Sequence, residues 1–143
     1  MLFMNTNGIA SQISDIRTKI NSYLLQELRK NGVTGLAPSH GALLNHLFHN
    51  KVVTMKELAV AVRRDKSTVT TLVGKLIAGG YVEKLPSIDD QRSYIVRLSQ
   101  KGEKLRPVFM EISNSLLSSI WQGINSTEQQ EVMRILKKIG DNL

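Results

Sequence analysis

Apolar and polar residues alternate along this chain with two periods, one of about 3.6 residues, as in a helix, and one of about 2, as in a strand. The helical period covers residues 9–30 and 38–50 near the N-terminus, and residues 100–123 and 127–143 near the C-terminus. The strand period is confined to residues 81–98. The pattern therefore predicts a mainly helical protein with one small β-hairpin.

Two short helices are expected close together in the middle of the chain. Thr54 is followed three residues later by Glu57, and these side chains can cap the first turn of a helix reciprocally. That helix is expected to end before Asp65, which is a favourable cap for a second helix over residues 66–78. Two helices joined by so short a turn are typical of a helix-turn-helix.

The second of these helices has two distinct faces. Its apolar residues share one side at helical pitch, which is expected to be buried: Val69, Leu72, Val73, Leu76 and Ile77. The opposite side carries short hydroxyls, a glycine and one cation: Ser67, Thr68, Thr71, Gly74 and Lys75. Such side chains can contact phosphates or base edges without holding the helix away from the floor of a major groove. The alternative is an ordinary surface helix whose hydroxyls are merely solvated.

A charged hairpin follows this helix. Gly79 and Gly80 tolerate the positive φ that ends a helix, and residues 81–85 are then expected to form a short strand. Residues 86–92 supply a polar turn, and residues 94–98 alternate as a returning strand. The order of helix, turn, helix and hairpin is that of a winged helix-turn-helix.

Specific residues of this region resemble the MarR (multiple antibiotic resistance regulator) family. Its members carry an Asp-x-Arg wing and a Leu-Thr-x-x-Gly helix start, and this chain has Asp-Gln-Arg at residues 90–92 and Leu-Ser-Gln-Lys-Gly at residues 98–102. Residues 65–70 and Leu76 are likewise similar to the family's recognition helix. These motifs cover about residues 54–102, whereas the resemblance in order and length covers the whole chain.

The resemblance implies a set of DNA contacts. The recognition helix would offer Ser67, Thr68, Thr70, Thr71 and Lys75. At the wing, Arg92 would reach into or beside the minor groove, where negative potential attracts a guanidinium, and Asp90 would orient the tip. An ion pair between these two residues that only shapes the turn is the alternative. Possible phosphate contacts are Arg63, Arg64 and Lys66.

The charge of the chain supports a polyanionic partner. The formal net charge is +7, and residues 54–106 alone carry eleven basic and six acidic residues, a net charge of +5. Most of the excess therefore lies in the expected DNA-binding region, although membranes and RNA also attract basic patches. Thr71 and Ser93 stand where the family often has basic residues, and each removes a possible phosphate contact.

Long amphipathic helices flank the winged region. Apolar stripes of this kind bury one another best across a two-fold axis, and the resemblance also implies a homodimer; a monomeric bundle is the alternative. Residues 34–99 are expected to form the DNA-binding lobe, and residues 1–33 and 100–143 the dimerisation lobe. Pro107 should kink or interrupt the helix after Ser99. The uncharged stretch after residue 111 is too rich in polar side chains for a membrane span, so no membrane partner is expected.

Other chemistry is limited by residues that the chain lacks. Without cysteine it forms no disulfide and no thiol-based redox sensor. His46 and His49 share a helix face and His40 lies nearby, but no cysteine or acidic residue accompanies them between residues 34 and 53. Histidines without metal are therefore favoured, and we expect no cofactor. Residues 1–10 show no secretory leader pattern, which favours the cytoplasm.

The favoured function is sequence-specific binding of double-stranded DNA by a homodimeric transcriptional regulator. The resemblance further implies a repressor released by a small aromatic or lipophilic effector, whose pocket residues the sequence does not identify. The alternative is a winged-helix module that binds a protein instead of specific DNA. An enzyme is not expected, because the chain has no cysteine nucleophile, Gly-rich phosphate loop or metalloprotease motif.

Overall fold

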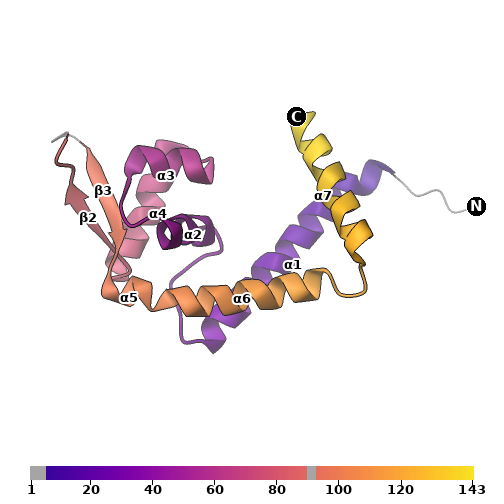
Figure 1. Ribbon diagram of the computed structural model, residues 1–143, viewed down its shortest axis with the longest axis horizontal. Coiled ribbons are helices and arrows are strands. Elements are labelled where there is room, and N and C mark those ends of the chain that lie inside the picture. Colours follow the sequence, from indigo (N-terminus) through magenta and orange to yellow (C-terminus); the bar gives the residue numbers. More distant parts are fainter. Residues whose placement is uncertain (1–5, 90–92) are drawn as a thin grey trace, which may run out of the picture.

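The computed structural model describes residues 6–89 and 93–143. Its elements in chain order are η1 (Thr6–Gly8), α1 (Ile9–Lys30), α2 (His40–His49), β1 (Val53–Thr54), α3 (Met55–Val62), α4 (Lys66–Ala78), β2 (Val82–Pro86), β3 (Tyr94–Leu98), α5 (Gln100–Glu103), α6 (Leu105–Ile120) and α7 (Ser126–Asp141). The winged lobe is made of α2, α3, α4 and the three strands, and Figure 1 shows its helices with β2 and β3 at one end of the molecule. A helical lobe, made of α1, α6 and α7, lies at the other. The expected fold class is confirmed.

The sheet has three antiparallel strands among the described residues, one more than the sequence pattern predicts. The strand order is β1-β3-β2, in which β2 and β3 form the expected hairpin and β1 pairs with β3 through Val53 and Thr54. Two residues are too few to show an alternation, so β1 is a strand only because β3 lies beside it. The strand expected over residues 81–85 runs instead from Val82 to Pro86.

Capping interactions fix the two helices of the helix-turn-helix. The Glu57 N–H donates to the Thr54 hydroxyl at 3.0 Å and the Thr54 N–H donates to the Glu57 carboxylate at 3.1 Å, which confirms the predicted reciprocal cap. The Asp65 carboxylate caps α4 by accepting the Thr68 N–H at 2.7 Å. Between the helices Arg63 has a left-handed backbone with a φ of 54°. This conformation is unfavourable for a residue with a Cβ, so the surrounding structure must hold it.

The apolar side of α4 packs into the core of the winged lobe. The fully buried side chains of this core include Leu43, Leu44, Leu58, Val69, Val73, Leu76 and Val96. Ile77, which the helical pattern placed on the buried side, is instead 39% exposed. It lies at the margin of the apolar stripe and in the last turn of α4, so the core that covers Leu76 does not reach it.

The connection from the sheet to the C-terminal helices depends on Ser99 and Gly102. The Ser99 hydroxyl accepts the Gly102 N–H at 3.1 Å and so caps α5. A Cβ on Gly102 would collide with the carbonyl oxygen of Tyr81, so only glycine lets α5 lie this close to the start of the hairpin. α5 ends at Glu103, four residues before Pro107, because a proline ring clashes with a helical carbonyl at that position. The predicted interruption is confirmed.

The helical lobe buries few of its apolar side chains. α7 contains no buried residue, and α1 contains only Leu28. Large apolar side chains that stay 39–52% exposed on α1, α6 and α7 are Ile9, Ile13, Ile16, Leu117, Val132, Ile135 and Leu136. The Tyr23 and Ser115 hydroxyls form a hydrogen bond of 2.5 Å that links α1 to α6. Within residues 6–89 and 93–143 no helix is both long and apolar enough to cross a membrane.

Candidate nucleic-acid interface

The outer side of α4 carries the residues that were expected to contact DNA. Those exposed to solvent are Ser67, Thr70, Thr71, Gly74 and Lys75, and Thr68 is half-buried. A Cβ added at Gly74 would meet nothing within 4 Å, so this glycine leaves a gap on the helix surface. The outer side of α4 is therefore a shallow polar strip with few bulky side chains.

Two of these threonines turn their hydroxyl protons toward their own helix. Thr70 donates to the Lys66 carbonyl at 2.8 Å, and Thr71 donates to the Ser67 carbonyl at 3.1 Å. Each then presents oxygen lone pairs and a methyl group outward. Lone pairs suit the amino groups of adenine and cytosine, and a methyl group suits thymine, whereas phosphate oxygens require donors. Thr70 and Thr71 therefore fit base edges better than the DNA backbone.

The N-terminal cap of α4 is electrostatically stable. The backbone N–H of Thr68 is the main reason why the pKa of Asp65 lies below its ordinary value of 3.8, and the Thr68 hydroxyl lowers this pKa further. Asp65 therefore stays ionised to more acidic pH than an ordinary aspartate, and the start of the recognition helix stays capped.

The three expected phosphate contacts near the start of α4 do not line one common surface. Lys66 lines a groove beside the hairpin, whereas Arg64 lines a pocket that faces α1. Leu72 also lines this pocket, so α4 has a wing side and an inner side. Arg63 is exposed in the left-handed turn.

The expected wing-tip residues Asp90 and Arg92 lie outside the described residues. The strands that carry the tip are described, and an ion pair between Glu83 of β2 and Arg97 of β3 links them at 2.8 Å. The hairpin therefore has charged residues well before its tip.

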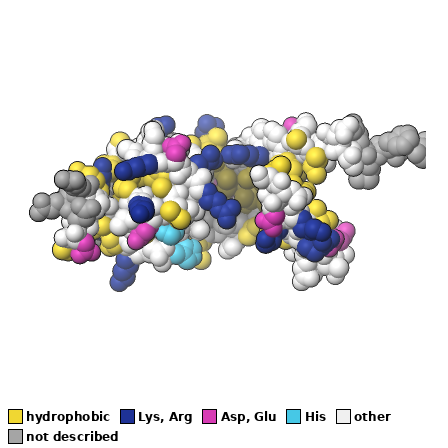
Figure 2. Space-filling view, turned by 90° about the horizontal axis from the view of Figure 1, so that it is seen from above, with side chains coloured by type: hydrophobic (Ala, Val, Ile, Leu, Met, Phe, Trp, Pro, Cys, Tyr) yellow, Lys and Arg dark blue, Asp and Glu magenta, His cyan; other side chains and the backbone are white. Residues whose placement is uncertain are grey.

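A pocket of about 370 Å³ lies between the two lobes, on the inner side of α4. Its lining side chains are Arg17, Asn21 and Leu24 of α1, Pro38, Ser39 and Ala42 around the start of α2, Val62 and Arg64 around the turn after α3, and Leu72 of α4. Figure 2 shows Lys and Arg side chains around the hollow between the lobes. The described lining has two guanidinium groups and no carboxylate, so it suits an anion. Sequence reasoning missed this pocket because four separate segments form it.

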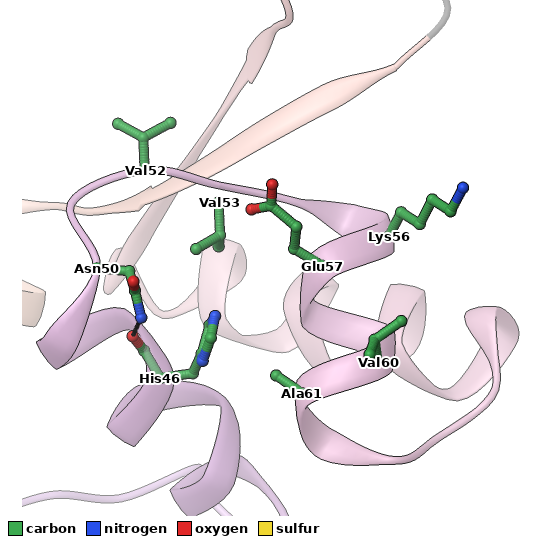
Figure 3. Close-up of a pocket in the computed structure, with 8 residues that line it drawn as sticks. All are labelled: His46, Asn50, Val52, Val53, Lys56, Glu57, Val60 and Ala61. Atoms are coloured by element: carbon green, nitrogen blue, oxygen red, sulfur yellow. Dashed lines mark hydrogen bonds between the residues drawn. The ribbon is translucent and has the colours of Figure 1, made fainter.

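The three histidines do not come together. His46 faces a pocket of about 570 Å³ between α2 and α3, with Glu57 on the other wall (Figure 3). The His49 ring folds back along α2, where its Nδ1 is 2.7 Å from the Asn45 carbonyl oxygen. His40 is buried. Among the described side chains no group of three His, Cys, Asp or Glu residues could hold a metal ion.

His40 lies buried at the junction of α2 and α4. Its Nδ1 accepts the Ala37 N–H at 2.9 Å, while Nε2 is buried with no hydrogen-bond partner in the described part of the chain. Burial is the main cause that lowers the pKa of His40 below 6.5, and the Lys75 ammonium also lowers it. The imidazole is therefore neutral at pH 7, and protonation would place a charge beneath the recognition helix.

The large apolar side chains that are exposed on α4 and the hairpin are Ile77, Ile88 and Tyr94 among the described residues. Val52 and Val60 are also exposed, but they line the pocket between α2 and α3. Lysines accompany them on both α4 and the hairpin. A surface of this kind favours a charged ligand over a protein partner, which would need a contiguous apolar patch.

Comparison with known proteins finds a matching family model and similar regulators. The MarR family model matches residues 34–93. The chain is 29% identical over 130 residues to the HTH-type transcriptional regulator BilQ of Clostridium symbiosum, and the aligned region covers 87% of this chain and 84% of BilQ. It is 22% identical over 90 residues to the transcriptional repressor MprA of Escherichia coli, and here the aligned region covers 63% of this chain and 51% of MprA.

Solved structures share the fold. A MarR protein from Peptoclostridium difficile superposes with a TM-score of 0.84 at 23% identity, covering 99% of this chain and 92% of that one. A mutant E. coli MarR complexed with operator DNA superposes with a TM-score of 0.82 at 20% identity, covering 97% of this chain and 98% of that one. Residues 34–93 thus match the MarR family, the curated relatives are similar in sequence, and the solved structures share the fold.

Proposed function

We propose that this chain binds a specific double-stranded DNA site as a homodimer and regulates transcription there. The observation that carries this proposal is α4, a capped helix whose outer side offers small polar groups and Lys75 around the open position of Gly74. Its surroundings are basic, since residues 54–106 carry a net charge of +5. Such a helix can lie in a major groove and contact base edges through its threonines. Arg92 at the wing tip would add a minor-groove contact.

The exposed apolar stripes of the helical lobe support the homodimer. Residues 34–99 are then the DNA-binding lobe, and residues 1–33 and 100–143 are the dimerisation lobe. A second copy is the fitting partner because its identical stripes can cover α1 and α7 across a two-fold axis. Two recognition helices then reach successive major grooves about 34 Å apart, so the preferred site is a pseudo-palindrome.

The inter-lobe pocket supports control by a small aromatic or lipophilic acid. A carboxylate can accept hydrogen bonds from Arg17 on α1 and from Arg64 just before α4, while Leu24 and Leu72 contact the apolar part of the ligand. Such a ligand ties the recognition helix to a dimerisation helix. A ligand that binds best when α4 is placed unsuitably for DNA releases the protein from its site, and the protein then acts as a repressor.

The test is fluorescence anisotropy with the duplex upstream of the chain's own gene, a scrambled duplex and two salt concentrations. We expect a preference for the native duplex of about 10³-fold or more, with both affinities falling steeply as salt rises. Equal binding to both duplexes would contradict specific recognition of this site. No binding to either would favour a protein-binding module.

Two variants of Thr71 test the base contacts. Thr71→Val keeps the outward methyl group and removes the lone pairs, whereas Thr71→Ser keeps the hydroxyl and removes the methyl group. If Thr71 reads base edges, each variant should lose affinity for the native duplex and leave the affinity for the scrambled duplex unchanged. Equal losses on both duplexes would assign Thr71 to the backbone instead.

A further inference from the structure

A second basic feature lies on the wing side of α4. A groove of about 600 Å³ lies between the start of α3, the start of α4 and the strands of the hairpin. Its lining residues, which define the wing-side groove, are Thr54, Met55, Lys56, Lys66, Thr70, Lys84, Ser93 and Tyr94. The described lining contains three lysines, one each from α3, α4 and β2, and no carboxylate.

The three lysines of the wing-side groove keep their charge available. They form no ion pair with any described residue. The carboxylates next to them in sequence are engaged elsewhere, since Glu57 caps α3 and Glu83 pairs with Arg97. Ammonium groups gathered around one groove repel one another and raise the local positive potential, so an anion between them is stabilising.

Strand alternation explains why Lys84 belongs to this groove while Glu83 does not. Side chains of β2 point to opposite faces in turn, so Lys84 shares a face with the buried Val82. The cross-strand partner of Lys84 is the buried Val96, and Tyr94, two residues before Val96 on the same face of β3, lines the groove together with Lys84. The Lys84 ammonium lies 4.1 Å from the centroid of the Tyr94 ring, which holds the ammonium in place without neutralising it.

We propose that the wing-side groove holds the phosphates of one DNA strand, and that Lys56, Lys66 and Lys84 bind them. This inference rests on the proposed DNA binding. A helix in a major groove has a sugar-phosphate backbone on each side, and Arg64 faces the inner side of α4. The wing side therefore needs its own cations, and the sequence alone had suggested only Lys66.

The position of Thr70 links the groove to base recognition. This residue lines the groove and also lies on the outer side of α4, so the two surfaces are continuous. A strand whose bases face α4 then has its phosphates beside the three lysines. The occupant of the groove is accordingly a DNA backbone that also contacts the recognition helix.

The experiment measures the salt dependence of binding for Lys56→Gln and Lys84→Gln. Each lost phosphate contact should make the plot of log binding constant against log salt concentration less steep by about 0.9, or by about 1.8 for a dimer with two copies of the contact. Affinity should fall equally for the native and the scrambled duplex, because phosphates carry no sequence. Lys138→Gln on α7, an exposed lysine of the helical lobe, is the matched control for the loss of one charge.

Slopes for Lys56→Gln and Lys84→Gln that equal the slope of Lys138→Gln would overturn the proposal. Single neutral methylphosphonates placed along the native duplex locate the contact. At the phosphate that Lys84 binds, the methylphosphonate should weaken binding of the wild-type protein but not weaken binding of Lys84→Gln any further. If the methylphosphonate and Lys84→Gln weaken binding additively at every position, the proposal is also overturned. The proposed function is tested separately: it would be contradicted if the wild-type protein bound the native and the scrambled duplex equally well.

Discussion

The two lobes of this protein differ in how they bury apolar surface. In the winged lobe Leu43, Leu44, Leu58 and Leu76 are completely buried, because helices and a sheet enclose one core. In the helical lobe several apolar side chains of α1, α6 and α7 are each 39–52% exposed. The winged lobe is thus complete within one chain, whereas the helical lobe is suited to completion by a second copy.

This difference fits the separate tasks that we propose for the lobes. The winged lobe presents α4 on its own core, and in the proposed homodimer the helical lobe would set the distance between two such units. The lobes meet where Arg106 of α6 donates to the Phe48 carbonyl at the end of α2, and where the Phe48 and Phe109 rings pack edge to face at 5.6 Å. The proposed ligand in the inter-lobe pocket would bind elsewhere between the lobes, where α1 faces the turn into α4. In the proposed homodimer, a shift there would change the spacing of both recognition helices.

The largest expected effect comes from breaking the core of the winged lobe. Leu58→Ala should lower the free energy of unfolding by about 2–5 kcal/mol, because a fully buried leucine leaves a cavity. Val60→Ala is the matched control on the same helix, since Val60 is 72% exposed and should cost little. Urea unfolding followed by circular dichroism measures both. Similar losses for the two variants would contradict the idea of a self-contained core.

The second effect concerns the helical lobe. Leu136→Glu should separate the proposed dimer and lower DNA affinity by about 10²-fold or more, because two half-sites are then no longer bound by one linked pair. The winged lobe should stay folded. Analytical ultracentrifugation measures the dimer, and anisotropy measures the affinity. Gln130→Glu adds the same charge on another side of α7 and should leave a dimer; a dimeric Leu136→Glu protein would contradict the assigned interface.

A smaller effect is expected at the left-handed turn of the winged lobe. Arg63→Gly should be more stable than Arg63→Ala by about 1 kcal/mol, because glycine adopts a φ of 54° without a Cβ penalty. Both variants lose the same cation, so their DNA affinities should fall together if Arg63 contacts a phosphate. Thermal unfolding and anisotropy on the same samples separate the two roles. Equal stabilities would show that the turn is not strained.

The smallest effect is a pH dependence confined to the winged lobe. The pKa of His40 is lowered in the fold, so below about pH 6.5 the unfolded chain binds a proton that the folded chain resists, and stability falls as the pH falls. The urea midpoint should drop between pH 7.5 and 5.5 in the wild type and less in His40→Asn. His49→Asn, at an exposed position, should keep the wild-type drop. Identical pH profiles for all three proteins would exclude this role.

Much of the fold could be predicted because short-range interactions determine it. The start of α4 follows from the Asp65 cap and its end from Gly79 and Gly80, and residues 66–78 form the helix that these signals indicate. The reciprocal cap at Thr54 and the interruption before Pro107 are likewise properties of a few neighbouring residues.

Other features could not be predicted because they depend on distant segments. β1 exists through its pairing with β3, and the exposure of Ile77 depends on where the core ends. The DNA contacts expected at Asp90 and Arg92 stay predictions, since they lie outside the described residues. No local pattern brings Lys56 and Lys84 together, because they lie on different elements.

The sequence by itself determined the helices, their caps, the hairpin and the resemblance to a family, because each depends on residues that are neighbours along the chain. Only the tertiary structure decided which cations share a surface. It placed Arg64 with Arg17 between the lobes and Lys66 in the wing-side groove. The physical reason is that hydrogen bonding and periodicity act over one or two turns, whereas electrostatic and packing surfaces form only when remote elements meet.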